Sequence, residues 1–340
     1  MVEGPLPGLS LTYDKTPFRH QPKGVSIVQG APHKPVGSKR FPTHILVFLI
    51  PATLIYTVFM IYPLIDSMRL SLFTADSAGR ETFIGLQNYV TLLTNELWAP
   101  RFWGALKNNF IFFLIHMVVQ NSIGLMLAAL LTSRTVRGSG FFRTVYFLPT
   151  MLSFVIVGFV WQLILSPLWG VAEGIMGVVG LDQFFKPWLG LESTALITLS
   201  LISVWQFIGI PMILFYAALI GIPDELIEAA VVDGASAWQI FWRIKFPLIL
   251  PAVGIVFILT YVGNFNAFDL VYTTQGALAG PNFSTDLMGT LFYRTFFGQQ
   301  LQLGNPSMGA TVATMMFFII LIGVLIYTFV WQRRVGSYEL

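Results

Sequence analysis

The chain carries long stretches that contain no Asp, Glu, Lys or Arg. A helix needs about 20 mostly apolar residues to cross a bilayer, and each of these stretches is longer than that. The stretches are bounded by Arg40 and Asp66, Lys107 and Arg134, Arg143 and Glu173, Glu192 and Asp224, Lys245 and Asp269, and Arg294 and Arg333. The pattern therefore predicts six membrane-crossing segments.

The segments are predicted to be helices and not strands of a barrel. Strands that cross a membrane alternate apolar and polar residues, whereas Phe110 to Val119 and Met315 to Val330 are almost continuously apolar. Composition agrees, because 55% hydrophobic and 10% charged residues are not typical of a soluble domain. We expect an all-α integral membrane protein.

Charge placement predicts the domain organisation and the orientation. Residues 1–43 are rich in Pro, Gly and Lys and lack periodicity, so we expect a cytoplasmic tail without regular structure. Residues 44–334 form the predicted six-helix domain, and 335–340 a short cytoplasmic tail. If the N-terminus is inside, 13 of the 19 basic residues lie on the cytoplasmic side, where Lys and Arg accumulate. Both termini are therefore predicted to be cytoplasmic.

The sequence offers no set of residues typical of an enzyme. It has no cysteine, and its histidines, His20, His33, His44 and His116, lack metal-ligand spacing. It also lacks a glycine-rich phosphate loop that ends in Gly-Lys-Ser or Gly-Lys-Thr. We expect no catalytic activity, and any ATP-driven process would need another subunit.

The segment 222–247, between the fourth and fifth stretches, is amphipathic and too charged to cross a membrane. Pro223 suits the start of a short helix, and Gly234 suits the left-handed residue that ends it. Ser236 and Gln239 form a capping-box pattern that opens a second helix, and Pro247 is expected to stop it.

A helix pair of this kind has two readings. A DNA-binding role is disfavoured because acidic side chains outnumber basic ones and would repel phosphates. The helices are better suited to docking a cytoplasmic protein through apolar anchors. The charged residues are Asp224, Glu225, Glu228, Asp233, Arg243 and Lys245, and the anchors are Leu226, Ile227, Trp238 and Phe241.

The same segment resembles a known signature. Glu228-Ala229-Ala230, followed by Gly234 and then by Ile244, Phe246 and Pro247, is similar to the "EAA" motif of permeases in binding-protein-dependent ABC importers. Phe246 stands where the motif usually has Leu. The resemblance extends through Gly138 to Pro149 and Asn264 to Tyr272, covers about residues 44–334, and is to the maltose-type, carbohydrate-uptake branch.

The resemblance implies a site and a set of partners. In this family the "EAA" helices insert into a cleft on an ATPase subunit, so the implied coupling residues are Glu228, Ala229, Ala230, Gly234, Ile244 and Pro247. The implied partners are a second, homologous permease subunit, two ATPase subunits that bind ATP and Mg, a solute-binding protein, membrane lipid and a carbohydrate, with no nucleic acid. The implied location is the bacterial inner membrane.

Polar residues inside the predicted spans are candidates for the solute passage, because they are costly in lipid. Most are expected to be contacts between helices, including His116 and Gln120. The full set is Asn108, Asn109, His116, Gln120, Asn121, Gln162, Ser203, Gln206, Asn264, Asn266 and Asp269.

The resemblance selects three of these residues and adds two apolar ones. It implies that Ser203, Gln206, Phe207 and Ile210 face the passage, with Asn264 opposite. Residues two apart on a helix point about 200° apart, so we expect Asn264 to face the passage and Asn266 to be a packing contact.

Two other classes stay open. An ion-coupled secondary transporter of small polar solutes would show internal repeats and ionisable groups inside its spans, for which Asp269 is the nearest candidate. A membrane-embedded enzyme would need clustered His, Asp or Glu. The identity of the solute, and which of two permeases binds it, stay open.

Overall fold

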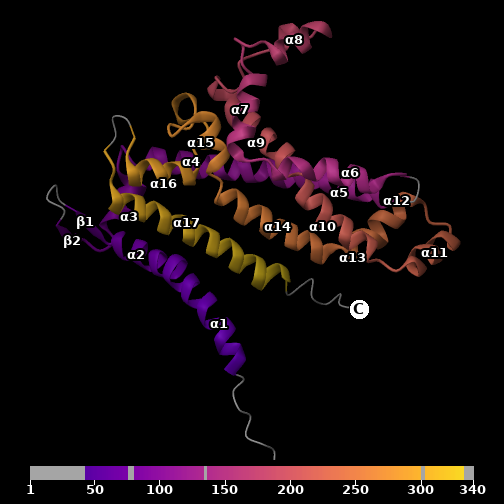
Figure 1. Ribbon diagram of the computed structural model, residues 1–340, viewed down its shortest axis with the longest axis horizontal. Helices are drawn as coiled ribbons and strands as arrows, with labels where there is room; N and C mark the ends of the chain where they lie inside the picture. The colour runs from indigo at the N-terminus through magenta and orange to yellow at the C-terminus, as the bar shows by residue number, and fades with distance from the viewer. Residues whose placement is uncertain (1–42, 76–79, 134–135, 300–302, 333–340) are drawn as a thin grey trace, which may run out of the picture. The chain divides into compact units, whose positions relative to one another are not determined.

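The computed structural model of the chain describes residues 43–75, 80–133, 136–299 and 303–332 (Figure 1). Of the predicted tails, only Thr43 lies in this described part. The chain divides into two units, residues 1–54 and residues 55–340, and the packing discussed below lies within the second unit.

The described residues are mostly helical. The helices of the first half are α1 (Thr43–Tyr56), α2 (Tyr62–Leu70), α3 (Gln87–Thr94), α4 (Ala99–Ile115), α5 (Asn121–Leu131), α6 (Ser139–Phe147), α7 (Phe154–Ile164) and α8 (Val171–Val178). Those of the second half are α9 (Glu192–Phe207), α10 (Gly209–Ile220), α11 (Asp224–Val232), α12 (Ala237–Ile240), α13 (Phe246–Leu248), α14 (Leu250–Phe265), α15 (Asp269–Gln275), α16 (Met288–Phe297) and α17 (Pro306–Ile326). π-helical turns lie at Thr57–Ile61, His116–Gln120, Phe241–Lys245 and Tyr327–Gln332, and 3₁₀ turns lie at Leu148–Met151, Asp182–Phe184 and Pro281–Phe283.

One small element departs from the all-α expectation. Strand β1 (Phe73–Ala75) pairs antiparallel with β2 (Glu81–Phe83), and Thr74 lies opposite Thr82. Aromatic and β-branched residues favour this pairing, and the rings of Phe73 and Phe83 meet edge to face at 5.4 Å. The hairpin follows the first predicted span. Its strands have only three residues each, so the protein is still classed as a helical membrane protein.

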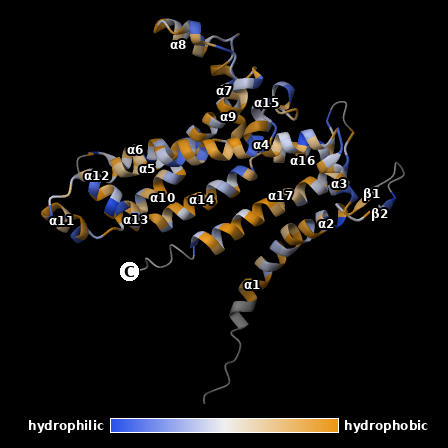
Figure 2. Cartoon of the chain, turned by 180° about the vertical axis from the view of Figure 1, so that it is seen from behind, coloured by the Kyte–Doolittle hydropathy of each residue, from blue (hydrophilic) through white to orange (hydrophobic). Residues whose placement is uncertain are grey.

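Long apolar helices confirm that the chain is a helical membrane protein. Within the described residues, Val47–Leu70, Ala99–Leu131 and Pro306–Gln332 are each long and apolar enough to cross a membrane. Three bent helix pairs pass the same test together, so the number rises to six if each pair is one span. All overlap the predicted stretches, and Figure 2 shows apolar residues along much of α17.

Each bent pair has a proline near its break. The axes turn by 96° between Ser139–Met151 and Phe154–Ile164, by 45° between α9 and α10, and by 66° between Ala237–Leu248 and α14. The nearby prolines are Pro149, Pro211 and Pro251. A proline lacks the N–H that would continue the helical bonding and its ring crowds the preceding turn, which accounts for the bends before Pro211 and Pro251.

Three hydrophobic clusters form the core of the described residues. Leu199, Ile202 and Val271 belong to the first cluster, in which α4, α7, α9 and α15 meet. Met212, Phe215 and Ile249 are buried in the second, between α5, α10 and α14. The third joins α3 and α4 to α16 and α17.

Polar side chains join the helices by bonding to backbone groups of other elements. Asn109 donates to the carbonyl of Asn264 at 2.9 Å and accepts from the N–H of Met288 at 2.7 Å, so it connects α14 to α16. Similar side-chain bonds to carbonyls run from Asn108 to Ser284 and Asp286, from Gln162 to Thr274, from Gln275 to Leu189, and from Tyr261 to Ile319. The expectation that most polar residues of the spans are contacts between helices is confirmed for Asn109 and Gln162, whereas Asn108 bonds to the loop before α16.

A buried ion pair fixes the segment before α16. Arg294 donates two hydrogen bonds to the carboxylate of Asp286, at 2.6 and 3.2 Å, and a third to the carbonyl of Ala277 at 3.1 Å. Thr290 donates to the same carboxylate, and the guanidinium lies 4.7 Å from the ring centre of Phe283. Both charged side chains are at most 3% exposed. Arg294 was expected to bound the last span, but that span begins at Pro306.

Gly209 allows a close approach between helices. A Cβ at this position would lie 2.7 Å from the Cα of Phe147 and from the carbonyl oxygen of Tyr146, both backbone atoms. We expect Gly209→Ala to lower the stability of the membrane domain by about 1–3 kcal/mol, because α10 and the end of α6 must move apart.

Thermal unfolding of the purified protein would measure this effect. Gly174→Ala in α8 is the matched control, since a Cβ there meets nothing within 4 Å. An unfolding temperature that falls equally in both variants would contradict the role of Gly209.

Candidate functional site: a polar cavity and a cytoplasmic helix pair

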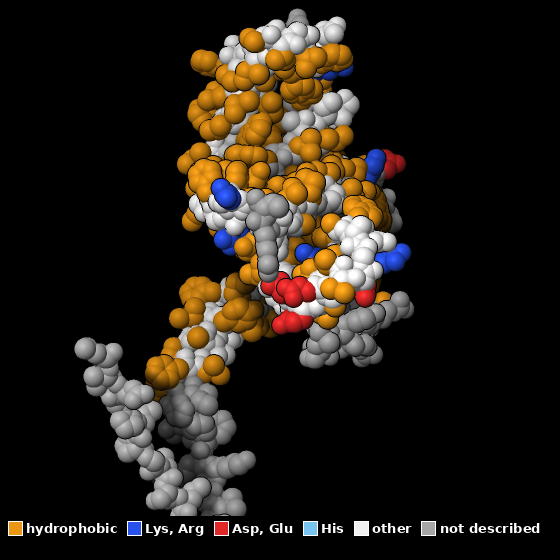
Figure 3. Space-filling view, turned by 90° about the vertical axis from the view of Figure 1, so that its right-hand side faces the viewer, with side chains coloured by type: hydrophobic (Ala, Val, Ile, Leu, Met, Phe, Trp, Pro, Cys, Tyr) orange, Lys and Arg blue, Asp and Glu red, His pale blue; other side chains and the backbone are white. Residues whose placement is uncertain are grey.

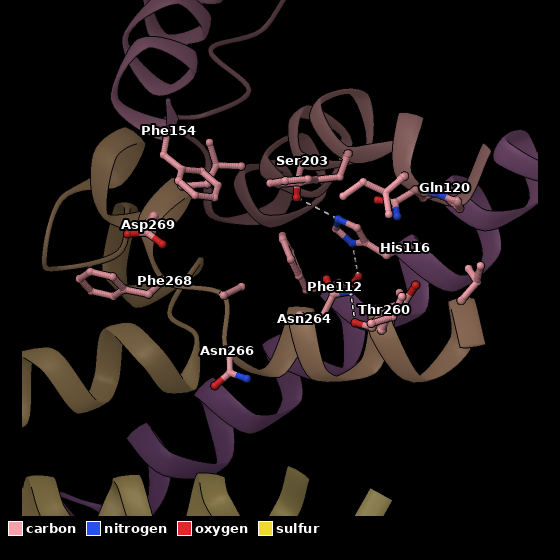
Figure 4. Close-up of a pocket in the computed structure, with 18 of the residues that line it drawn as sticks. Phe112, His116, Gln120, Phe154, Ser203, Thr260, Asn264, Asn266, Phe268 and Asp269 are labelled. Atoms are coloured by element: carbon pink, nitrogen blue, oxygen red, sulfur yellow. Dashed lines mark hydrogen bonds between the residues drawn. The ribbon is translucent and has the colours of Figure 1, made fainter. Parts of the chain in front are cut away.

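A cavity of about 420 Å³ opens between helices that lie within the second, fourth and fifth predicted stretches. This volume lies within the range of small-molecule sites. Its walls come from α4 and the π turn after it, from the start of α7, from α9, α10 and α14, and from the start of α15 with the chain leading into it (Figure 4). The polar or aromatic residues of the lining are Phe112, His116, Gln120, Phe154, Ser203, Phe207, Thr260, Asn264, Asn266, Phe268 and Asp269.

Four of the five predicted passage residues line this cavity, namely Ser203, Phe207, Ile210 and Asn264. Gln206 lies elsewhere. Its side chain is 1% exposed and donates to the carbonyl of Leu152, in the break between α6 and α7, at 3.2 Å. That contact holds the amide against the chain between α6 and α7 and away from the cavity.

The two asparagines of the fifth stretch both line the cavity, so the expectation that only one would face it is wrong. Helical spacing no longer applies at the second of them, because α14 ends at Phe265 and Asn266 has φ −95° and ψ 3°. Asn264 is buried and donates to the carbonyl of Thr260 at 2.7 Å. Asn266 is exposed at the rim.

His116 and Gln120 also line the cavity, although the sequence favoured packing roles for both. Nε2 of His116 lies 2.9 Å from the hydroxyl oxygen of Ser203, and Nδ1 lies 2.8 Å from the carbonyl oxygen of Phe112 (Figure 4). Gln120 is 6% exposed, and its Oε1 is buried without a hydrogen-bond partner among the described residues. Both residues lie on the second span, which the resemblance did not place in the passage.

A second hollow of about 530 Å³ adjoins the cavity and shares Asn266 and Phe268 with it. Its other walls come from α16 and α17. The ring of Phe268 lies 5.1 Å from that of Tyr272 and 5.2 Å from that of Tyr293. The rim of the cavity on this side is therefore largely aromatic.

The segment 222–247 folds much as its sequence predicts. Helix α11 begins directly after Pro223, and Gly234 has φ +79°. Ser236 accepts from the N–H of Gln239 at 3.3 Å, and Gln239 accepts from the N–H of Ser236 at 2.8 Å, so the capping box is confirmed. The second helical run continues through the π turn to Leu248 and ends one residue after Pro247.

This segment presents a mixed acidic and apolar surface. Glu228, Ala229 and Gly234 are exposed, Ala230 is buried, and Ile244 and Pro247 are half-buried. Figure 3 shows acidic side chains gathered on the side of the molecule where α11 lies in Figure 1. Of the predicted anchors, Leu226 and Trp238 are exposed, whereas Ile227 and Phe241 are half-buried.

These features belong to an established class of membrane protein. Residues 120–335 match the family model described as binding-protein-dependent transport system inner membrane component. The chain belongs to this family, and the resemblance seen in the sequence is confirmed. It is therefore a multi-pass permease component of an ABC transporter.

Curated relatives match most of the chain. The probable ABC transporter permease protein YurN of Bacillus subtilis (strain 168) is 37% identical over 78% of this chain and 89% of its own length. The probable starch degradation products transport system permease protein AmyD of Thermoanaerobacterium thermosulfurigenes is 30% identical over 84% and 93%. The lactose transport system permease protein LacF of Rhizobium radiobacter is 32% identical over 74% and 82%.

A solved structure shares the fold. The crystal structure of a bacterial ABC transporter involved in the import of the acidic polysaccharide alginate includes a chain that matches with a TM-score of 0.70. The match is 22% identical and covers 88% of this chain and 96% of that one. At this identity the likeness concerns the fold alone.

Proposed function

We propose that this chain is one of two permease subunits in an ATP-driven importer and that it carries a sugar or sugar-like solute through the cavity. The observation that carries the proposal is the lining itself. Amides, two hydroxyls, an imidazole and aromatic rings face a space with one acidic residue, Asp269, and, among the described residues, neither Lys nor Arg. Sugars offer hydroxyl donors and acceptors along their edges and apolar C–H faces, which suit such walls. Starch products and lactose in the names of AmyD and LacF support this solute class.

The same proposal assigns the remaining tasks to other subunits. Two ATPase subunits bind ATP and Mg, a solute-binding protein delivers the sugar, and a second, homologous permease completes the passage. This chain then needs no cofactor and no catalytic site, and it has no nucleic-acid partner. Family membership supports a binding-protein partner, since the family's description names binding-protein-dependent transport.

We further propose that segment 222–247 docks the ATPase subunit. Its exposed acidic and small residues, Glu228 and Ala229, together with Gly234 are available to a partner surface. Ala230, Ile244 and Pro247 are more buried and would hold the helix pair against the membrane domain. The distribution of basic residues supports a cytoplasmic position for this segment and both termini, with the chain in the bacterial inner membrane.

Reconstituted transport tests the proposed function. The complete transporter in proteoliposomes is offered radiolabelled maltotriose, lactose, raffinose and alginate trisaccharide in the presence of its binding protein. We expect uptake of at least one of them that requires ATP inside the vesicle. Uptake driven by a proton or sodium gradient without ATP would favour the ion-coupled secondary transporter instead.

Within that assay, we expect Asn264→Leu to reduce uptake by about tenfold while the complex still assembles. The substitution removes an amide from the cavity wall and replaces it with an apolar side chain. Affinity of the binding protein for the sugar should be unchanged. Normal uptake by Asn264→Leu would place the main solute contacts in the partner permease.

A further inference from the structure

We propose that His116, Ser203 and Gln120 form a subsite that accepts hydrogen bonds from the hydroxyl groups of the passing sugar, an extension that rests on the proposed function. The subsite lies where the second span meets α9. The resemblance gave no passage role to the second span, and this proposal adds a specificity-determining wall to the cavity.

The first observation concerns Gln120. Its side chain is 6% exposed and lines the cavity, yet its buried Oε1 has no hydrogen-bond partner in the described structure. Buried polar groups are nearly always hydrogen-bonded, because an unpaired acceptor loses its bonds to water without compensation. A donor brought into the cavity by the solute supplies the missing partner once the amide of Gln120 turns this shielded oxygen toward the cavity.

The second observation concerns the direction of the bond between His116 and Ser203. Nδ1 of His116 faces the carbonyl oxygen of Phe112, which can only accept, so Nδ1 carries the hydrogen. In the neutral ring Nε2 is then the acceptor, and the hydroxyl of Ser203 donates to it at 2.9 Å. The Ser203 oxygen is left with lone pairs only, so it offers the cavity an acceptor. His116 is thus a positioning residue that sets the polarity of Ser203.

The third observation is the backbone that carries these side chains. His116–Gln120 forms a π turn in which the N–H of Asn121 donates to the carbonyl of His116. Such turns are rare in proteins, and those that occur are often found at functional sites. Here the turn leaves Phe112, His116 and Gln120 all on the cavity wall. Asn121, the first residue of α5, donates a hydrogen bond to Thr260 of α14 at 3.2 Å, and this bond anchors the turn.

These acceptors predict a specific kind of selectivity. A sugar hydroxyl can donate to Gln120 or Ser203, whereas a fluorine in its place cannot donate. A site built to bond a hydroxyl strongly rejects an analogue that lacks it, because buried polar groups are then left unpaired. The transporter should therefore discriminate against a deoxyfluoro sugar at the hydroxyl that reaches this wall.

Import of deoxyfluoro analogues tests the subsite. The probe is whichever oligosaccharide of the panel the wild-type transporter imports, together with its mono-deoxyfluoro derivatives that the binding protein holds as tightly as the parent. We expect at least one derivative to be imported with an apparent KM tenfold or more above that of the parent. In Gln120→Met, which keeps the length of the side chain but removes the amide, this ratio should fall below threefold.

A matched control and the contrary outcomes complete this assay. Gln162→Met makes the same change in α7, at a residue that does not line the cavity, and should keep the wild-type ratio. Discrimination that survives in Gln120→Met would overturn the subsite while leaving the proposed function intact. If the wild-type transporter imports none of the sugars, the proposed function fails, and this inference fails with it.

The role of His116 has a readout that needs no import. ¹⁵N NMR of the assembled transporter, with His20, His33 and His44 of this chain replaced by Gln, reports the protonation of each ring nitrogen. We expect a proton on Nδ1 and a bare Nε2 whose resonance moves in Ser203→Ala. A proton on Nε2 would reverse the bond to Ser203 and refute the assigned polarity, even if Gln120→Met fails to assemble.

Discussion

Gly234→Val is expected to abolish ATP-dependent uptake while the membrane domain stays folded. Gly234 has φ +79°, a conformation that costs a β-branched residue about 1–2 kcal/mol or more. A Cβ there meets nothing within 4 Å, so the backbone angle and not crowding opposes the substitution. The turn between α11 and α12 would change direction, and the helix pair would no longer fit the ATPase subunit that we propose docks there. Copurification of the ATPase and uptake in proteoliposomes measure the effect.

Gly234→Asn is the matched control, because Asn tolerates the left-handed conformation better than other residues with a side chain. We expect this variant to keep most of the uptake and to retain the ATPase. Wild-type uptake by Gly234→Val would refute the coupling role of the turn. Equal loss in both variants would show that the partner requires the absence of a side chain and does not depend on the backbone angle.

Arg294→Met should destabilise the protein more than Gly209→Ala does. It leaves the carboxylate of Asp286 buried at 3% exposure without its ion-pair partner, and only the more distant charge of Arg101 remains to attract it. Breaking a buried ion pair by removing one partner costs about 3–5 kcal/mol, because the remaining charge has lost both water and its partner. Unfolding of the purified protein in a denaturing detergent titration would measure this loss.

Two further variants separate the ion pair from a general effect of losing Arg. Asp286→Asn combined with Arg294→Met removes both charges and should recover a large part of the stability lost in Arg294→Met. Arg69→Met breaks pairs with Asp66 and Glu81 that are exposed to solvent, and should change stability little. A double variant as unstable as Arg294→Met would show that the charge on Asp286 is not the cause.

Features set by neighbours in the sequence could be predicted from the sequence. The start of α11 after Pro223, the left-handed Gly234 and the capping box of Ser236 and Gln239 each depend on a few adjacent residues, and all three are confirmed. The apolar stretches were predictable for a similar reason, since each stretch is long enough by itself to need the membrane.

Features set by distant parts of the chain could not be predicted in this way. Gln206 points away from the cavity because a carbonyl 54 residues earlier holds it. Asn266 escapes helical spacing because α14 ends one residue before it. Nothing in the sequence around Arg294 shows that it folds onto Asp286 and the carbonyl of Ala277. The break at Ile208, which changes the direction of the chain between two cavity residues, had only Gly209 and Pro211 as local signals.

The side-chain bonds that join the helices have an evolutionary consequence, because most of them end on a backbone carbonyl. The amides of Asn108, Asn109 and Gln275 and the hydroxyl of Tyr261 each recognise a group that every amino acid carries. The receiving position can therefore mutate without a compensating change in the donor. Correlated substitutions between homologues would not reveal these contacts. The same arrangement of helices can persist while the residue that supplies the carbonyl changes from one homologue to the next.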